Sequence, residues 1–271
     1  MDDLQQSHEP VIDESPAPAP PAPIYTYILI GSIAAVFIAQ MIFGDSGNIR
    51  ALISLVGDDR SALAAGFVKP YVVRCHEYWR ILTGAAVHGG AIHVVMNCYA
   101  FLMFGRLCEV LSNRAHTAIV FLLACIGGGL LSFLFLPDTI SVGASGGIVG
   151  LLGYITVYAF RRRRFISPEF RKGLLINIGS LFIFGLVLFN VVDNYGHLGG
   201  LVVGALYGLI QIPSNEYVDP RRSGTVTKIL GIAAVAVFVV TCLAGILLIA
   251  NYRKTVLPET LDGPCTSSPA R

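Results

Sequence analysis

The sequence predicts an all-α membrane protein, a polytopic helical bundle in which seven helices cross the bilayer. Hydrophobic residues make up 54% of the 271 residues and charged residues 13%, and the mean hydropathy is +0.69. Soluble domains carry about 25% charged residues, so this composition excludes an ordinary soluble protein of this size. The apolar residues also gather in runs of roughly 20, the length that a helix needs to span the hydrocarbon core.

Seven apolar runs account for the predicted helices. They are Ile24 to Phe43, Ala91 to Gly105, Ala115 to Leu136, Ser145 to Phe160, Leu174 to Val192, His197 to Ile212 and Ile229 to Ala250. We therefore divide the bundle into a six-helix core, residues 24–212, and an added loop and seventh helix, residues 213–250. The runs show no internal repeat of the kind that marks many transporters.

The two ends of the chain are predicted to lie outside the bundle. Residues 1–23 are acidic and then rich in proline and alanine, a composition that cannot bury a core and favours a disordered tail. They contain no Lys or Arg, so they resemble neither a signal peptide nor an Arg-rich transit peptide. We expect the first run to be retained in a bacterial inner (plasma) membrane, and residues 251–271 to form a short tail.

The basic residues set the predicted orientation. The densest cluster follows the fourth run and comprises Arg161, Arg162, Arg163, Arg164, Arg171 and Lys172. Short loops rich in Lys and Arg lie in the cytoplasm, so this connection and the N-terminal tail are predicted inside. The long first connection, residues 44–90, is then outside, and its aromatic residues indicate a partly embedded interfacial loop. Cys75 and Cys265 are also predicted on the outer side of the membrane, and the sequence does not say whether they form a disulfide.

Four polar residues lie where apolar ones are expected. His93 and Asn97 share one face of the second helix, Ser145 begins the fourth, and His197 lies near the start of the sixth. Strongly polar groups inside a membrane are costly, so they indicate function. In the orientation above, the starts of all three helices lie near the outer surface, and the four side chains can therefore meet at one depth.

The length of the fourth helix predicts a cavity. From Ser145 to Arg161 this helix is about 24 Å long, shorter than a hydrocarbon core of about 30 Å. Ser145 is therefore expected below the outer surface of the membrane. Residues 136–144 must then dip into the membrane as irregular backbone, which is tolerated only against protein or water. A water-filled cavity beside Ser145 follows.

Glycines on two helices predict how Ser145 and His197 meet. Small faces let membrane helices approach closely, and the glycines in question are Gly146, Gly150 and Gly153 on the fourth helix and Gly200, Gly204 and Gly208 on the sixth. A close crossing would bring Nε2 of His197 within hydrogen-bond reach of Ser145 Oγ, as a general base for a serine nucleophile requires. His93, Asn97 and the backbone N–H of Ser145 could donate to an oxyanion.

Other interpretations of these residues stay open. A glycine ladder alone is typical of helix packing, and a single buried histidine is often a structural donor. His88, His93 and His197 could hold a metal, but no acidic or Cys residue stands at ligand spacing, so we predict no metal and no cofactor. Arg106 and Glu109, three residues apart, are predicted to form a structural ion pair.

Taken in order, Trp79-Arg80, His93-xxx-Asn97, Gly143-Ala144-Ser145-Gly146 and His197-xx-Gly200-xxx-Gly204 resemble the rhomboid family of intramembrane serine proteases. The resemblance covers about residues 24–212 and implies a rhomboid-like catalytic core there, with the seventh helix added as in some members. It implies that Ser145 is the nucleophile and His197 the base, and that His93 and Asn97 with the Ser145 N–H form the oxyanion hole. It assigns structural and packing roles to Trp79, Arg80, Gly143, Gly146, Gly200 and Gly204.

The resemblance also implies the partners. Members cleave single-span membrane proteins near the outer end of the helix, and their substrates approach past the segment that corresponds to residues 182–195. One departure is Val149, where many relatives place an aromatic residue against the catalytic histidine. Transmembrane substrates and the bilayer are therefore the predicted partners, and no nucleic acid is suggested. The alternatives are an inactive rhomboid-like chaperone or trafficking factor, and a channel or transporter.

Overall fold

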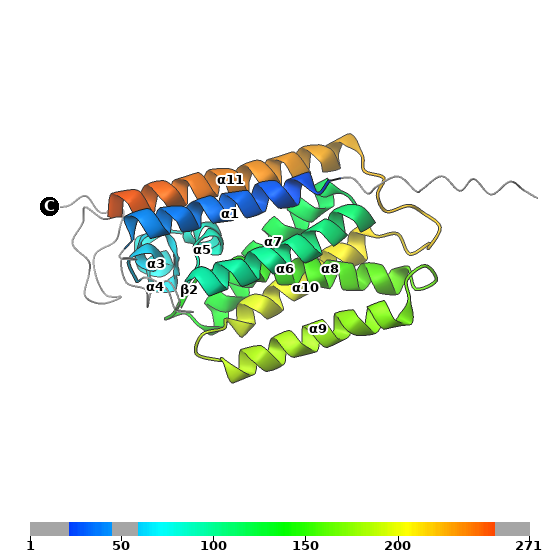
Figure 1. Ribbon diagram of the computed structural model, residues 1–271, viewed down its shortest axis with the longest axis horizontal. Coiled ribbons are helices and arrows are strands. Elements are labelled where there is room, and N and C mark those ends of the chain that lie inside the picture. The colour runs from blue at the N-terminus through cyan, green and yellow to red at the C-terminus, as the bar shows by residue number, and fades with distance from the viewer. Residues whose placement is uncertain (1–21, 45–58, 253–271) are drawn as a thin grey trace, which may run out of the picture.

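Seven long helices form the bundle that the sequence predicts (Figure 1). The computed structural model describes residues 22–44 and 59–252. Within them the long helices are α1 (Ile24–Phe43), α6 (Ala91–Leu111), α7 (Arg114–Phe135), α8 (Ser145–Arg161), α9 (Pro168–Val187), α10 (Asn194–Gln211) and α11 (Thr225–Tyr252). Most of the predicted tails, residues 1–21 and 253–271, lies outside the described residues.

The long helices are of two kinds. Five of those described, α1, α6, α7, α9 and α11, are long and apolar enough to cross a membrane. The other two, α8 and α10, have 17 and 18 residues. Helix α8 packs against α6, α7, α9 and α10, and its residues from Gly147 to Ile155 are all buried. The chain is therefore a multi-pass membrane protein with its shortest described long helix at the centre of the bundle.

The first connection folds into short elements at one end of the bundle. They are α3 (Asp59–Ala65), β1 (Phe67–Val68), α4 (Lys69–Cys75) and α5 (Arg80–Ala86). Strand β1 pairs antiparallel with β2 (Ile140–Ser141), with Phe67 opposite Ser141 and Val68 opposite Ile140. Strand β2 belongs to the segment that was expected to dip into the membrane as irregular backbone. The pairing with β1 satisfies part of that backbone, as a membrane requires.

A buried arginine holds this loop together. Arg80 is fully buried, its Nε lies 2.5 Å from Oε2 of Glu77, and its Nη1 donates to the carbonyl oxygen of Gly66 at 2.8 Å. Its guanidinium also lies over the rings of Tyr71 and Trp79, 5.1 and 4.6 Å from their centroids. A buried charge is tolerated only with such partners, so Arg80 fixes the shape of the loop.

The predicted ion pair between Arg106 and Glu109 is wrong. Glu109 instead accepts hydrogen bonds from the backbone N–H and the hydroxyl of Thr26, at 2.7 and 2.8 Å. The first N–H groups of a helix have no partner within that helix, and a carboxylate is a favourable acceptor for them. Glu109 therefore satisfies the start of α1 from the neighbouring helix α6.

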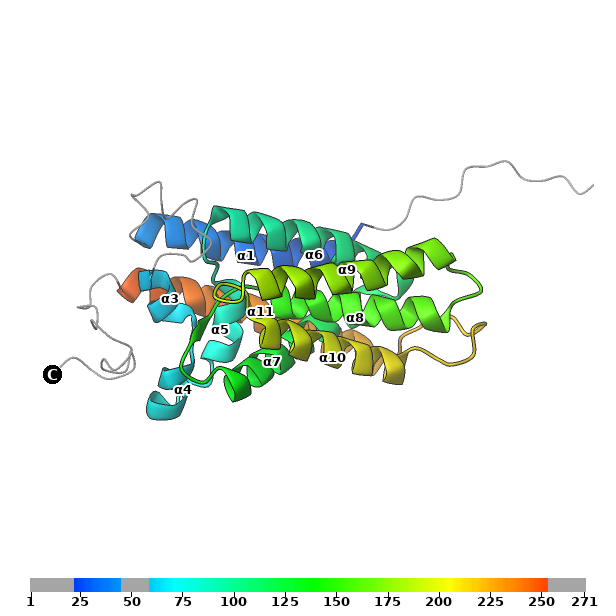
Figure 2. The same cartoon turned by 90° about the horizontal axis from the view of Figure 1, so that it is seen from below.

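The two ends of the bundle differ in composition. Two views place α3 and α5 beside the ends of α1 and α11, with α4 at the same end of the bundle (Figures 1 and 2). At the opposite end, the guanidinium of Arg162 donates to the carbonyl oxygens of Pro213, Asn215 and Val218, and so joins the α8–α9 and α10–α11 connections. The arginine cluster from Arg161 to Arg164 lies at this end, far from β2 along the length of α8.

Candidate active site

Helices α8 and α10 cross at backbone contact. A Cβ atom on Gly200 would collide with the carbonyl oxygen of Gly146, and one on Gly204 would collide with that of Gly150. Helix α7 takes part in the same contact, because a Cβ on Gly128 would come within 2.6 Å of the carbonyl oxygen of Gly196. Only glycine fits where backbones approach so closely. The crossing therefore fixes the separation between the starts of α8 and α10.

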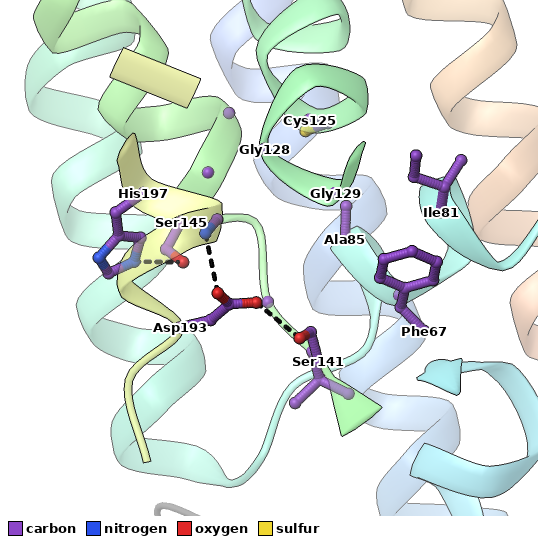
Figure 3. A pocket seen from close by; sticks show the side chains of 16 residues that line it. Phe67, Ile81, Ala85, Cys125, Gly128, Gly129, Ser141, Ser145, Asp193 and His197 are labelled. Atoms are coloured by element: carbon purple, nitrogen blue, oxygen red, sulfur yellow. Dashed lines mark hydrogen bonds between the residues drawn. The ribbon is translucent and has the colours of Figure 1, made fainter. Parts of the chain in front are cut away.

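This crossing brings Ser145 and His197 together. Nε2 of His197 lies 2.8 Å from Oγ of Ser145 (Figure 3). Ser145 is the first residue of α8, and His197 lies in the first turn of α10. His197 is 7% exposed, and its Nδ1 has no hydrogen-bond partner among the described residues. A neutral imidazole that accepts from a serine hydroxyl has the geometry of a general base and its nucleophile.

His93 and Asn97 lie beside the backbone that precedes Ser145. A Cβ on Gly143 would come within 2.8 Å of the His93 ring and 3.5 Å of Nδ2 of Asn97. Gly143 has φ of +114°, a conformation that other residues rarely adopt. The N–H of Gly89 donates to Nδ1 of His93 at 3.3 Å, which leaves Nε2 with the proton on the side of Gly143. Two side-chain donors thus gather next to the start of α8.

His88 contacts the same segment through the backbone of Ala144. Its Nδ1 lies 3.1 Å from the carbonyl oxygen of Ala86, and its Nε2 lies 3.4 Å from the backbone N of Ala144. Burial lowers the pKa of His88 to about 3, so its ring is neutral and Nε2 accepts from the Ala144 N–H. Gln40 clamps the backbone N–H and carbonyl of His88 with its side-chain amide. In the described part of the chain, no three His, Cys, Asp or Glu residues are placed to hold a metal.

A cavity of about 50 Å³ opens beside the Ser145 hydroxyl. One side is polar and includes Ser141, Asp193 and His197. The other is lined by small and apolar residues, which are Gly128, Gly129, Ala85, Cys125, Phe67 and Ile81 (Figure 3). A water needs roughly 10–15 Å³ of such space and two or more polar partners. The cavity therefore has room for a few waters next to Ser145, at the place where the sequence predicts a water-filled cavity.

A polar cluster at the cavity edge was missed by the sequence predictions. Asp193 accepts from the N–H of Gly196 at 2.8 Å through Oδ1, and from the hydroxyls of Ser132 and Ser141, the latter at 2.6 Å, through Oδ2. Nζ of Lys69 lies 3.9 Å from the same Oδ2. An aspartate directly before a helix is a sequence signal for an N-cap. Nothing in the sequence indicates that Lys69 reaches it.

The remaining predicted residues lie in the first loop and in the buried part of α8. Trp79 is the residue before α5 and is 37% exposed, while Arg80 is buried in the first loop. Val149 is buried in α8. No aromatic ring of the described residues stacks on His197. Its imidazole is held by the Ser145 bond and by the surrounding helices.

Comparison with known proteins gives the family. The sequence profile described as the Rhomboid domain matches residues 75–214, just over half of the chain. RHOMBOID-like protein 6, mitochondrial, of Arabidopsis thaliana is 35% identical over 162 residues, which are 56% of this chain and 50% of the relative. Rhomboid protease GluP of Bacillus subtilis is 32% identical over 186 residues, 67% of this chain and 34% of the relative. The chain spans half or less of these relatives, and it belongs to the rhomboid family.

Proposed function

We propose that this protein is an intramembrane serine endopeptidase that cleaves transmembrane segments of other membrane proteins with a Ser145–His197 dyad. The observation that carries the proposal is the 2.8 Å contact between Nε2 of His197 and Oγ of Ser145, made by a buried histidine and a half-buried serine at the starts of two helices. A relative in the same family is named Rhomboid protease GluP, and another Rhomboid-like protease 5. Both names agree with this chemistry.

The proposed reaction passes through an acyl-enzyme. Ser145 Oγ attacks the scissile carbonyl while Nε2 of His197 takes its proton, and the same proton then goes to the leaving amine. The oxyanion accepts hydrogen bonds from the Ser145 N–H, Nε2 of His93 and Nδ2 of Asn97, which lie next to Gly143. A water in the adjacent cavity then attacks the ester, with His197 again as the base, and restores the Ser145 hydroxyl.

The substrates are proposed to be single-span proteins cut near the outer bilayer face. The starts of α8 and α10, which carry the dyad, lie at the end of the bundle that holds the first loop, opposite the arginine cluster (Figure 1). Loops rich in arginine stay in the cytoplasm, so the dyad end is the outer one. Cys75 in this loop is disulfide-bonded, and disulfides persist in oxidising compartments outside the cytoplasm.

The location and the domain division of the protein are also proposals. We place the protein in a bacterial inner membrane with its N-terminus in the cytoplasm, because the match to GluP of Bacillus subtilis extends over two thirds of this chain. Residues 24–212 form the proposed catalytic core, which includes every residue of the dyad and of the oxyanion site. Residues 213–250 add the connection to α11 and most of that helix.

The test is cleavage of a panel of tagged single-span proteins with small residues near the outer helix end, in liposomes. The parent should release product, and Ser145→Ala and His197→Ala should each abolish it. Thr156→Ala is the matched control, since Thr156 lies on α8 away from the dyad and its hydroxyl donates to the carbonyl oxygen of Leu152 within the same helix. Cleavage that survives Ser145→Ala would refute the dyad.

A second readout covers the case in which no substrate in the panel is cut. A fluorophosphonate probe reports whether Ser145 is an activated nucleophile without any knowledge of the substrate. Labelling of the parent and not of His197→Ala supports the proposal. Failure to label the folded parent would favour a non-proteolytic member of the family, and ion flux that survives Ser145→Ala would favour a channel.

A further inference from the structure

Lys69 and Asp193 connect three segments that meet at the outer end of the site. Lys69 is the first residue of α4, and its Nζ donates to Oγ1 of Thr139 at 2.7 Å and lies 3.9 Å from Oδ2 of Asp193. Thr139 precedes β2, which leads into the segment before Ser145. Asp193 caps α10, four residues before His197. One lysine therefore touches both the segment before the nucleophile and the start of the helix that carries the base.

Both oxygens of the Asp193 carboxylate accept hydrogen bonds from the protein. Oδ1 accepts from the Gly196 N–H, and Oδ2 accepts from Ser132 and Ser141 and faces the ammonium of Lys69. The side chain borders the cavity and is 24% exposed, and each of its oxygens has a donor. These bonds tie Asp193 to α10, α7 and β2, and so suit it to positioning the start of α10.

Lys69 is held in an unusual setting for a lysine. Its side chain is fully buried, and it is surrounded by the Phe67 ring at 5.7 Å, by Thr139 from the α7–β2 connection and by Asp193 from the α9–α10 connection. Asp193 is the charged group of the described residues that acts on it, and its effect is weaker than that of burial. Burial lowers the pKa of Lys69 to about 8.

We propose that Lys69 and Asp193 are a positioning pair for the dyad, and that loss of the Lys69 proton loosens the start of α10 and slows the chemical step. This inference rests on the proposed function. When the ammonium becomes an amine, Asp193 loses the charge that holds it toward α4, while its N-cap bond to Gly196 remains. His197 lies one turn further along α10, so a small shift of the cap moves Nε2 relative to Ser145 Oγ.

The expected signature is an alkaline fall in kcat with little change in KM. A displacement of about 1 Å in a catalytic group can cost up to about 100-fold in rate, so we expect a fall of at least about tenfold. Lys69→Arg keeps the charge and does not titrate in this range, so its kcat should stay level through pH 9.5. Lys69→Met should have a low kcat at every pH, with no alkaline fall.

Two further variants separate charge from structure. Asp193→Asn keeps an N-cap acceptor of similar quality but removes the charge, and it should lower kcat and abolish the alkaline fall of the parent. Arg74→Met is the matched control, because Arg74 is an exposed cation of the same helix α4 that lies over Tyr71. Its profile should coincide with that of the parent.

Thermal unfolding of the full chain in detergent tests the titration without any substrate. Between pH 8 and the ordinary lysine pKa of 10.5, the unfolded chain binds the Lys69 proton and the folded chain does not. Stability contributed through Lys69 therefore rises with pH in this window. The melting temperature of the parent relative to Lys69→Met should rise between pH 7 and pH 10.

The outcomes separate this inference from the proposed function. A melting-temperature difference that stays constant with pH would overturn the buried, titrating Lys69. A pH-dependent difference together with identical kcat profiles for the parent and Lys69→Arg would overturn the positioning role. If the parent neither cleaves nor labels while the pH-dependent difference is present, the proteolytic function fails and the positioning role falls with it, although the titration of Lys69 stands.

Discussion

At the scale of single residues, the site depends on the backbone of Gly143. Its φ of +114° turns the chain so that the segment before Ser145 passes beside His93 and Asn97. No other residue adopts this conformation without strain, and a side chain here would also meet the His93 ring. The position therefore links a backbone requirement to the placing of His93, the proposed oxyanion donor.

Gly143→Ala should reduce cleavage far more than it reduces stability. The strained backbone costs about 1–3 kcal/mol, and the added Cβ displaces the His93 ring, whose hydrogen bond to an oxyanion is worth about 10²–10³ in kcat. Cleavage rates and melting temperatures of the two proteins would show this. Gly173→Ala, where a Cβ meets nothing within 4 Å, is the control. Wild-type rates in Gly143→Ala would remove His93 from the site.

At the scale of elements, the contact between α8 and α10 sets the geometry of the dyad. Gly200 and Gly204 rest against the carbonyl oxygens of Gly146 and Gly150, one turn apart. Any side chain at these positions pushes the helix axes apart, because both contacts are backbone on each side. The distance from Nε2 of His197 to Oγ of Ser145 increases with that separation.

Gly204→Val should destabilise the bundle and inactivate it. Overpacking of this kind costs about 1–3 kcal/mol, and the displaced α10 carries His197 away from Ser145. Unfolding of the purified protein and cleavage in liposomes measure the two effects. Gly179→Val on α9, where a Cβ has open space, should leave both close to the parent values. Equal effects of the two substitutions would argue against the α8–α10 contact as the cause.

The elements differ in how well the sequence predicts them. Helix α1 begins and ends at the predicted residues, since a bilayer demands a continuous apolar run, and Pro23 directly before the run and Gly44 directly after it mark its ends. Helix α9 begins earlier and ends earlier than its apolar run, because Ser167 and Pro168 start a helix whatever the hydropathy. The sequence did not predict the short elements of the first loop, α3, β1, α4 and α5. In a half-buried loop the apolar residues do not recur at a regular spacing that would indicate a helix or a strand.

The same contrast holds for the site. The contact between Ser145 and His197 was predicted, because small residues at helical spacing report which faces meet. The Lys69–Asp193 pair was not, because it joins an interfacial loop to the start of α10 and neither residue belongs to a pattern. The Arg106–Glu109 pair was predicted wrongly because the spacing of residues along one helix carries no information about neighbouring helices. In the structure, the Glu109 carboxylate accepts from the backbone N–H of Thr26 at the start of α1.

At the scale of the whole molecule, the two ends should be labelled from opposite sides of the membrane. Tyr78→Cys in the first loop and Phe165→Cys beside the arginine cluster both replace exposed residues. A membrane-impermeant maleimide should label the first on intact bacterial cells and the second only after permeabilisation. The parent protein gives the background from its own cysteines. The reverse labelling pattern would invert the proposed orientation and place cleavage at the cytoplasmic face.

The order in which the chain is made gives the His197–Ser145 contact a further consequence. The two residues are 52 apart, and α9 lies between them. During synthesis, Ser145 of α8 is therefore made before His197 of α10. The nucleophile therefore has no base until α10 has inserted and closed against α7 and α8. In the proposed mechanism, a chain that ends before α10 lacks the base, so proteolysis begins only once α10 has packed against α8.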